Sequence, residues 1–182
     1  MKLLNAALLV SIFSSIFLIS CRKENTDEEL LPPITQNGAN TFGCLINGKI
    51  YTQKGFLQNT PNFQLSVDTN FNDGSFGAIT FRKTDNTIVD FTIGSDSMKG
   101  VGLYPAKFNG RIGFTYSQTI SGNNQCFTIS KDVVGVRGFI RMTKYDLVNG
   151  IFSGEFEFHF SNPACGIGDS IHITNGRFDK KL

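Results

Sequence analysis

From Thr41 to the C-terminus, apolar and polar residues alternate with a period of two, and no stretch keeps an apolar period of 3.6 residues. Between positions 63 and 71, for example, the apolar residues stand at odd positions, with Gln64, Ser66 and Asp68 between them. This pattern is typical of antiparallel strands that bury one face and expose the other. The sequence therefore predicts an all-β domain.

A sheet with one apolar face must cover that face, either by curling into a barrel or by folding into two layers. The linkers between the expected strands are short, which favours neighbouring strands that pair in chain order. We predict an antiparallel meander of about nine or ten strands that closes into a lipocalin-like barrel or half-barrel, with a two-sheet β-sandwich as the alternative.

Three tight turns set the expected register of this meander. A three-residue loop that ends in a left-handed residue connects odd positions to odd positions and keeps the apolar residues on one face. The loops expected from this rule are residues 72–74, 84–86 and 148–150. The pairs expected across them are Leu65 with Phe81, Phe81 with Val89, Ile79 with Phe91, Phe156 with Met142, and Phe158 with Ile140. In the last strand, the parity of the apolar residues changes at Asn175-Gly176, which indicates a β-bulge.

The first twenty residues have a different character from the rest of the chain. Met1-Lys2 is followed by an apolar stretch that ends in Leu18-Ile19-Ser20-Cys21. A basic start, an apolar stretch and a small residue at the cleavage point are typical of a secretory signal peptide, here residues 1–20. The Leu-Ile-Ser-Cys segment resembles the lipobox of bacterial lipoproteins. The resemblance implies that Cys21 carries a diacylglycerol and an acylated amino group, with an uncleaved membrane helix as the alternative.

Residues 21–40 are expected to form a lipid-anchored flexible tether, and residues 41–182 a single β domain. Pro32-Pro33 prevents a helix in the tether, which spans at most about 60–70 Å when extended. The acidic residues after Cys21 resemble the signal that exports lipoproteins of Bacteroidota-type bacteria to the cell surface, while a solvated charged linker is the alternative reading. The expected location is the outer membrane, at the cell surface or the periplasmic face.

Four segments of the expected strands resemble a family of small uncharacterised lipoproteins from Bacteroidota-type bacteria, known only as a domain of unknown function. These segments are residues 41–48, 140–146, 153–158 and 173–179. The family often has Trp shortly after the first Asn-Gly turn, where this chain has Tyr51. The resemblance implies a fold and an envelope location, and it implies no activity.

Three cysteines remain once Cys21 is lipidated, so the oxidising envelope allows one intramolecular disulfide and leaves one thiol. Cys44 lies in an apolar strand and is expected to be a buried thiol. Cys126 and Cys165 form the candidate disulfide, because Cys165 lies in a Gly-rich loop. The expected strand registers place Cys126 several residues from the strand end where the Cys165 loop lies, so the pairing stays open.

The polar faces of the last strands hold the residues best suited to metal binding or acid–base catalysis. His159 is expected opposite His172, about 5 Å apart at Cβ, but a zinc site needs three or four protein ligands and none completes the set. Glu155 and Glu157 share that face, and a solvated ion pair with Arg141 explains them better than glycosidase chemistry does. We therefore predict no catalytic residues, no metal and no cofactor.

The charge balance also limits the choice of partners. A net charge of +2 and the lack of aromatic residues among the strand-face arginines disfavour a nucleic-acid partner. The membrane is the expected partner, through the N-terminal acyl chains. Inside the barrel, a Phe-rich face with small residues (Gly77, Gly138 and Gly154) favours a non-catalytic module that binds a small hydrophobic ligand.

The alternative function is a structural or protein-interaction lipoprotein with a fully packed core. The volume of the interior distinguishes the two, because ligand pockets are larger than about 300 Å³. The residues expected to enclose this interior are Leu65, Phe81, Phe91, Ile140, Phe156 and Phe158.

Overall fold

The computed structural model describes most of the chain from Leu30 onward. The described residues are 30–55, 59–70, 74–83, 87–106, 112–120, 123–129, 136–161 and 170–182. They form eleven β-strands, and none of them belongs to a helix long and apolar enough to cross a bilayer.

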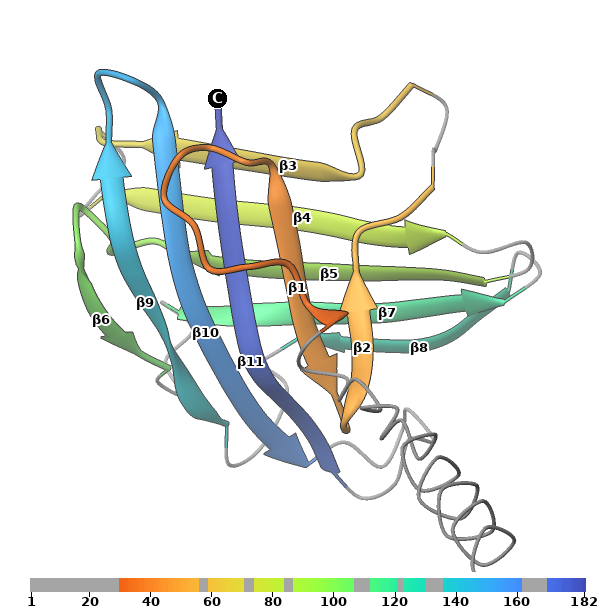
Figure 1. Ribbon diagram of the computed structural model, residues 1–182. Helices are drawn as coiled ribbons and strands as arrows, with labels where there is room; N and C mark the ends of the chain where they lie inside the picture. Colours follow the sequence, from red (N-terminus) through yellow and green to blue (C-terminus); the bar gives the residue numbers. More distant parts are fainter. Residues whose placement is uncertain are drawn as a thin grey trace, which may run out of the picture.

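The strands form two antiparallel sheets (Figure 1). The six-stranded sheet has the order β2 (Lys49–Thr52), β1 (Thr41–Ile46), β11 (Ser170–Lys181), β10 (Ile151–Ser161), β9 (Arg137–Asp146) and β6 (Gly102–Pro105). The five-stranded sheet has the order β3 (Phe63–Asp68), β4 (Ser75–Lys83), β5 (Thr87–Ser95), β7 (Ile112–Ile120) and β8 (Asn123–Ile129). The predicted all-β antiparallel fold is confirmed.

Most strands pair with their neighbours in the chain, as the short linkers predict. Three pairings depart from chain order: β5 pairs with β7, β6 pairs with β9 in the other sheet, and β1 pairs with β11. The last of these brings the start of the domain beside its end. In Figure 1 the strands of the five-stranded sheet run across those of the six-stranded sheet, so the two sheets form crossed layers.

The core lies between the two layers and is built from aromatic rings. The Phe42 ring of β1 contacts Phe63 of β3, Phe91 of β5 and Phe156 of β10, with ring centroids 5.5, 5.9 and 5.2 Å apart. Phe42, Phe91 and Phe156 have no exposed surface, and Phe63 is 2% exposed. Aromatic pairs at such distances stabilise a core beyond the area they bury.

The registers predicted for β3–β4 and β4–β5 are wrong by an odd number of residues. Leu65 pairs with Ala78 instead of Phe81, and Phe81 pairs with Asp90 instead of Val89. The reason is that six residues lie between the paired Asp68 and Ser75, and four lie between the paired Lys83 and Ile88. With an even number of residues between partners, odd positions pair with even ones. Gly74 has the predicted left-handed conformation, with φ of 87°, but the loop before it is longer than three residues.

As a result, β4 buries the face opposite to the predicted one. Phe76, Ala78 and Thr80 point into the core, whereas Ile79 is 50% exposed. Phe81 is buried too, but it lies on the other face of β4 and outside the core that the two sheets share.

The predicted pairs between β9 and β10 are wrong by two residues, yet the predicted faces are correct. Phe156 pairs with Ile140 and Phe158 with Gly138. The turn again spans an even number of residues, between Asp146 and Ile151, but a register shift between Ser153 and Gly154 restores the parity. A register shift of one residue moves all the following side chains of a strand to the opposite face of the sheet. The predicted inward-facing residues Ile140, Met142, Phe156 and Phe158 are all buried.

Residues 30–40 pack on the domain, although the sequence suggested a flexible tether; we call them the strap. Leu31 is 6% exposed, and the Cγ and Cδ atoms of Pro32 lie beside Gly43. Figure 1 shows the strap, in orange, passing over the outer face of β10 and β11. The described domain therefore begins upstream of the expected boundary at Thr41.

Candidate functional site

A groove of about 320 Å³ lies on the outer face of the six-stranded sheet, under the strap. The strap, β9, β10 and β11 all contribute to it. The lining residues are Ile34, Phe139, Arg141, Glu155, Phe156, Glu157, Asn175, Gly176 and Arg177. The groove thus lies on the face opposite to the core, because Ile140 and Phe158 alternate with its residues and point inward.

The groove forms beside the β-bulge that the sequence predicted in β11. The register of β10 with β11 shifts between Phe156 and Phe158, and Asn175 adopts a left-handed conformation with φ of 53°. Gly176 pairs with Phe156, and a Cβ at position 176 would lie 2.5 Å from the Phe156 ring. Only glycine lets β11 approach that ring so closely. The predicted bulge is confirmed, and it shapes the floor of the groove.

One row of charges crosses the groove from strand to strand. Glu155 of β10 pairs with Arg141 of β9 on one side and with Arg177 of β11 on the other. The Arg141 Nη1 atom lies 3.7 Å from the Glu155 Oε2 atom, and the Arg141 guanidinium lies 5.7 Å from the centroid of the Phe139 ring. The predicted pairs Phe156–Met142 and Phe158–Ile140 set Arg141 opposite Glu157. The four-residue turn and the register shift of β10 together make Glu155 its partner instead.

The Arg177 side chain is held in place by two backbone carbonyls. Its Nε donates to the Asn175 carbonyl at 3.2 Å, and its Nη1 donates to the Pro32 carbonyl at 3.4 Å. Because neither partner is charged, the positive charge of Arg177 is not neutralised by these bonds. The Glu157 side chain, by contrast, makes no hydrogen bond or ion pair with any residue that the structure describes. The groove therefore offers a positioned cation and an unpaired carboxylate.

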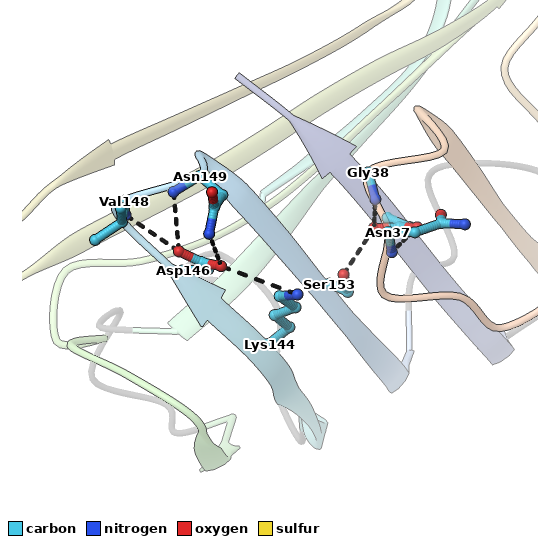
Figure 2. A network of polar contacts seen from close by, with 8 residues as sticks. Asn37, Gly38, Lys144, Asp146, Val148, Asn149 and Ser153 are labelled. Carbon is cyan, nitrogen blue, oxygen red and sulfur yellow. Dashed lines mark hydrogen bonds and ion pairs between the residues drawn. The ribbon is translucent and has the colours of Figure 1, made fainter.

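Asp179 fastens the strap that forms one wall of the groove. The residue is 1% exposed, and its carboxylate accepts five hydrogen bonds. The donors are the Thr35 and Ser153 hydroxyls, both at 2.7 Å, and the backbone N–H groups of Asn37, Gly38 and Ala39 at 3.1, 2.9 and 3.0 Å. Figure 2 shows Asn37, Gly38 and Ser153 at this point of the domain.

These bonds decide the charge of Asp179. Burial by itself raises the pKa of a carboxyl group, but the donors around Asp179, led by the Ala39 N–H and the Thr35 hydroxyl, outweigh burial and lower its pKa. The carboxylate is therefore ionised at neutral pH. The sequence gives no signal for this residue, because four of its five hydrogen-bond partners lie 140 or more positions away in the chain.

The two histidines lie on the same outer face, beyond the groove. His159 pairs with His172 as predicted, and their ring centroids are 3.7 Å apart. His172 Nε2 and the Ser170 hydroxyl are within hydrogen-bond distance at 2.8 Å. Among the residues that the structure describes, no three His, Cys, Asp or Glu side chains gather into a metal site.

The predicted buried thiol is confirmed at Cys44, which has no exposed surface. Burial raises the pKa of this thiol, so it stays protonated at neutral pH and is a poor nucleophile. Cys21, Cys165 and the side chain of Cys126 lie outside the described residues. Lipidation of Cys21 and the Cys126–Cys165 disulfide therefore remain predictions.

The glycines expected to leave room for an internal ligand do not do so. A Cβ at position 154 would lie 2.6 Å from the Phe178 ring, and one at position 138 would meet the backbone of Glu157 and Phe158. Gly77 lies on the outer face of β4, since Phe76 and Ala78 point inward. The space beside Gly154 and Gly138 is already filled by the neighbouring strands.

We compared the chain with known proteins in three ways. No protein-family model matches it, and the searches of curated proteins and of solved structures found no similar chain.

Proposed function

We propose that this chain is a non-catalytic binding lipoprotein of the cell envelope, and that its binding site is the groove under the strap. One contrast carries this proposal. The aromatic rings of Phe42, Phe91 and Phe156 are in mutual contact at the centre of the domain, whereas the groove outside is open and holds charged groups. A ligand that binds between the sheets has to displace buried rings, and a ligand that binds in the groove displaces water.

The membrane anchor in this proposal is lipidated Cys21. The Leu-Ile-Ser-Cys segment and the resemblance to small envelope lipoproteins support it, and two or three acyl chains anchor a protein firmly. Leu30 is nine residues after Cys21, so the domain lies at most about 30 Å from the bilayer. This is half the reach that a tether of residues 21–40 allows, because the strap is fastened to the domain.

For the architecture, we infer a two-sheet sandwich with crossed layers rather than a closed barrel. No ladder joins described strands of the two sheets, and a single parallel bridge between Lys54 and Arg82 links them. Crossed sheets of this kind are a known way to pack two antiparallel layers.

The groove supports binding better than catalysis. Glu155 is already engaged by Arg141, and no serine, cysteine or histidine side chain lines the groove beside Glu157. Nucleophilic catalysis needs a nucleophile within hydrogen-bond reach of a base, and the lining residues do not provide that pair.

Two measurements on the full-length protein in detergent test the proposal. We expect a thermal-shift screen of small polar compounds to give hits that are lost in Glu157→Gln, whereas the uncharged apolar probe N-phenyl-1-naphthylamine does not bind the folded protein. Strong binding of the apolar probe without any polar hit would place the site between the sheets and refute the proposal. Incorporation of an alkyne fatty acid in cells, lost in Cys21→Ala, tests the anchor.

A second candidate function is a protein-interaction module, and one surface favours it. Leu147, Val148 and Leu182 are 58, 93 and 60% exposed. The Leu182 N–H donates to the Gly150 carbonyl at 2.8 Å, so the C-terminus lies beside the β9–β10 turn. Apolar side chains that gather on a surface often mark a protein contact. Loss of a crosslinked envelope partner in Val148→Ser, with the groove variants unaffected, would favour this function.

A further inference from the structure

We infer that the groove binds a small zwitterion, with the anionic group on Arg177 and the ammonium group on Glu157. This inference rests on the proposed function and specifies its ligand. Two sources supply such a molecule in an envelope: the phosphoethanolamine headgroup of a lipid, and an amino acid or short peptide. Both combine an oxyanion and an ammonium group separated by a few bonds.

The anionic end is assigned by the way Arg177 is held. Hydrogen bonds to the Asn175 and Pro32 carbonyls fix the guanidinium between the bulge and the strap. A guanidinium has five N–H donors, so two bonds leave donors for an oxyanion. Because the side chain is already ordered, little conformational entropy is lost on binding.

The ammonium end is assigned by Glu157 and Phe139. The Glu157 side chain has no ionic or hydrogen-bond partner among the described residues, and the backbone of Glu157 pairs across the strands with that of Phe139. A carboxylate next to an aromatic ring favours an ammonium group, which gains an ion pair and a cation–π contact.

The spacing of the two assigned groups suits one molecule. Glu155 pairs with Arg177, and Glu157 lies two positions further along β10. In a regular antiparallel pair, such diagonal neighbours have Cα atoms about 7–8 Å apart. The β-bulge lies at this point of the ladder, and at a separation of this order the two side chains can close on opposite charges that are a few bonds apart. The groove volume of about 320 Å³ accommodates a molecule of this size.

The other two charges of the groove disfavour a ligand with one sign of charge. Arg141 and Glu155 form their own ion pair, so the four charged groups of the groove sum to zero. A lone anion on Arg177 is repelled by Glu155 and Glu157, and a lone cation on Glu157 is repelled by the two arginines.

Ligand-observed NMR on the full-length protein in detergent micelles tests the inference. The two zwitterionic probes are O-phosphoethanolamine and alanyl-alanine, and the single-charge probes are inorganic phosphate and ethanolamine. We expect at least one zwitterion to bind about tenfold or more tightly than either single-charge probe, and Arg177→Gln and Glu157→Gln to weaken it about ten- to hundredfold. Arg137→Gln is the matched control, because Arg137 lies on the same face of β9 but does not line the groove.

Binding of a third zwitterionic probe distinguishes the two sources of the ligand. Soluble dihexanoyl phosphatidylethanolamine that binds as tightly as O-phosphoethanolamine supports a lipid headgroup, and tighter binding of alanyl-alanine supports a peptide or amino acid. The inference is overturned if neither zwitterion binds at about 10 mM, if phosphate alone binds equally well, or if Glu157→Gln changes nothing. Glu157→Gln removes no described contact, so misfolding does not confuse this result. If the zwitterions fail while other polar compounds still depend on Glu157, the inference fails and the proposed function stands.

Discussion

Replacing Asp179 by asparagine keeps the size of the side chain but removes its charge. The Oδ2 atom accepts bonds from Thr35, Asn37 and Ala39, and the Oδ1 atom accepts bonds from Gly38 and Ser153. An amide has one acceptor oxygen, so one of these two sets must face an NH2 group. With the oxygen at the Oδ2 position, the Ser153 hydroxyl can rotate to accept a bond, but the Gly38 N–H is left without an acceptor.

The cost of this change follows from the bonds that are lost or weakened. A hydrogen bond to a charged group contributes about 1.5–3 kcal/mol, and a neutral one contributes about 0.5–1.5 kcal/mol. One bond is lost and the other four become neutral, but a neutral amide costs less to bury than a carboxylate and this offsets part of the loss. We therefore expect Asp179→Asn to lower the free energy of unfolding by roughly 3–5 kcal/mol. For a domain of this size, the melting temperature falls by roughly 10–15 °C.

The effect also depends on pH in a defined direction. The pKa of Asp179 is lowered in the folded state, because the hydrogen bonds from the strap and Ser153 outweigh burial. The stabilisation is therefore complete above the unfolded pKa of about 3.9 and is lost as the pH falls through the lower folded value. The stability difference between the native chain and Asp179→Asn should thus shrink below about pH 4.

Thermal unfolding monitored by circular dichroism from pH 2.5 to 7, with hydrogen exchange of the Gly38 and Ala39 amides, measures both effects. Asp146→Asn is the control. Asp146 accepts bonds from the Val148 and Asn149 N–H groups in the β9–β10 turn (Figure 2), away from the strap. The Asp146→Asn variant should leave hydrogen exchange of the Gly38 and Ala39 amides unchanged. If Asp179→Asn melts within about 2 °C of the native chain and both amides exchange as slowly as before, the reasoning is refuted.

Three further predictions concern the core. Gly154→Ala should lower the free energy of unfolding by about 1–3 kcal/mol, because its Cβ would lie 2.6 Å from both the Phe178 ring and the Arg141 carbonyl. The control is Gly100→Ala, because a Cβ at position 100 meets open space. Equal denaturant midpoints for the two variants would contradict the prediction. Phe156→Ala should cost about 3–5 kcal/mol in urea unfolding, and a loss no greater than that of Val148→Ala, at a 93% exposed position, would argue against a packed core. Cys44 should resist maleimide in the folded protein and react after denaturation, since burial raises the pKa of its thiol; peptide mass mapping that finds Cys44 labelled in the native state would disprove this.

Local features of the fold were predictable from the sequence. Alternation gave the all-β class and the inward faces of β9 and β10, and the parity change at Asn175-Gly176 gave the bulge that shapes the groove floor. The pairing of His159 with His172 followed from setting the apolar residues Phe158 and Phe160 opposite Ile173 and Ile171. Each of these depends on neighbours in the chain or on two adjacent strands, which a pattern of period two records directly.

The predicted face of β4 was wrong because the strand has apolar residues on both faces. Phe76 and Ala78 compete with Ile79 and Phe81 for the core, and the choice depends on Phe91 and Ile93 of β5 and on the opposite sheet. Turn length was therefore not decided by turn residues alone. The packing of the whole core selected the loop that suited it.

What the sequence by itself determined is the kind of structure: strands with one buried face, a bulge near the C-terminus and a buried thiol in the first strand. What only the tertiary structure decided is where those strands leave a usable surface. The strap is held by Asp179 across 140 or more positions of the chain, and the groove needs three strands and the strap together. Contacts of this range leave no periodic trace in a sequence, because they depend on which surfaces meet after the sheets have packed.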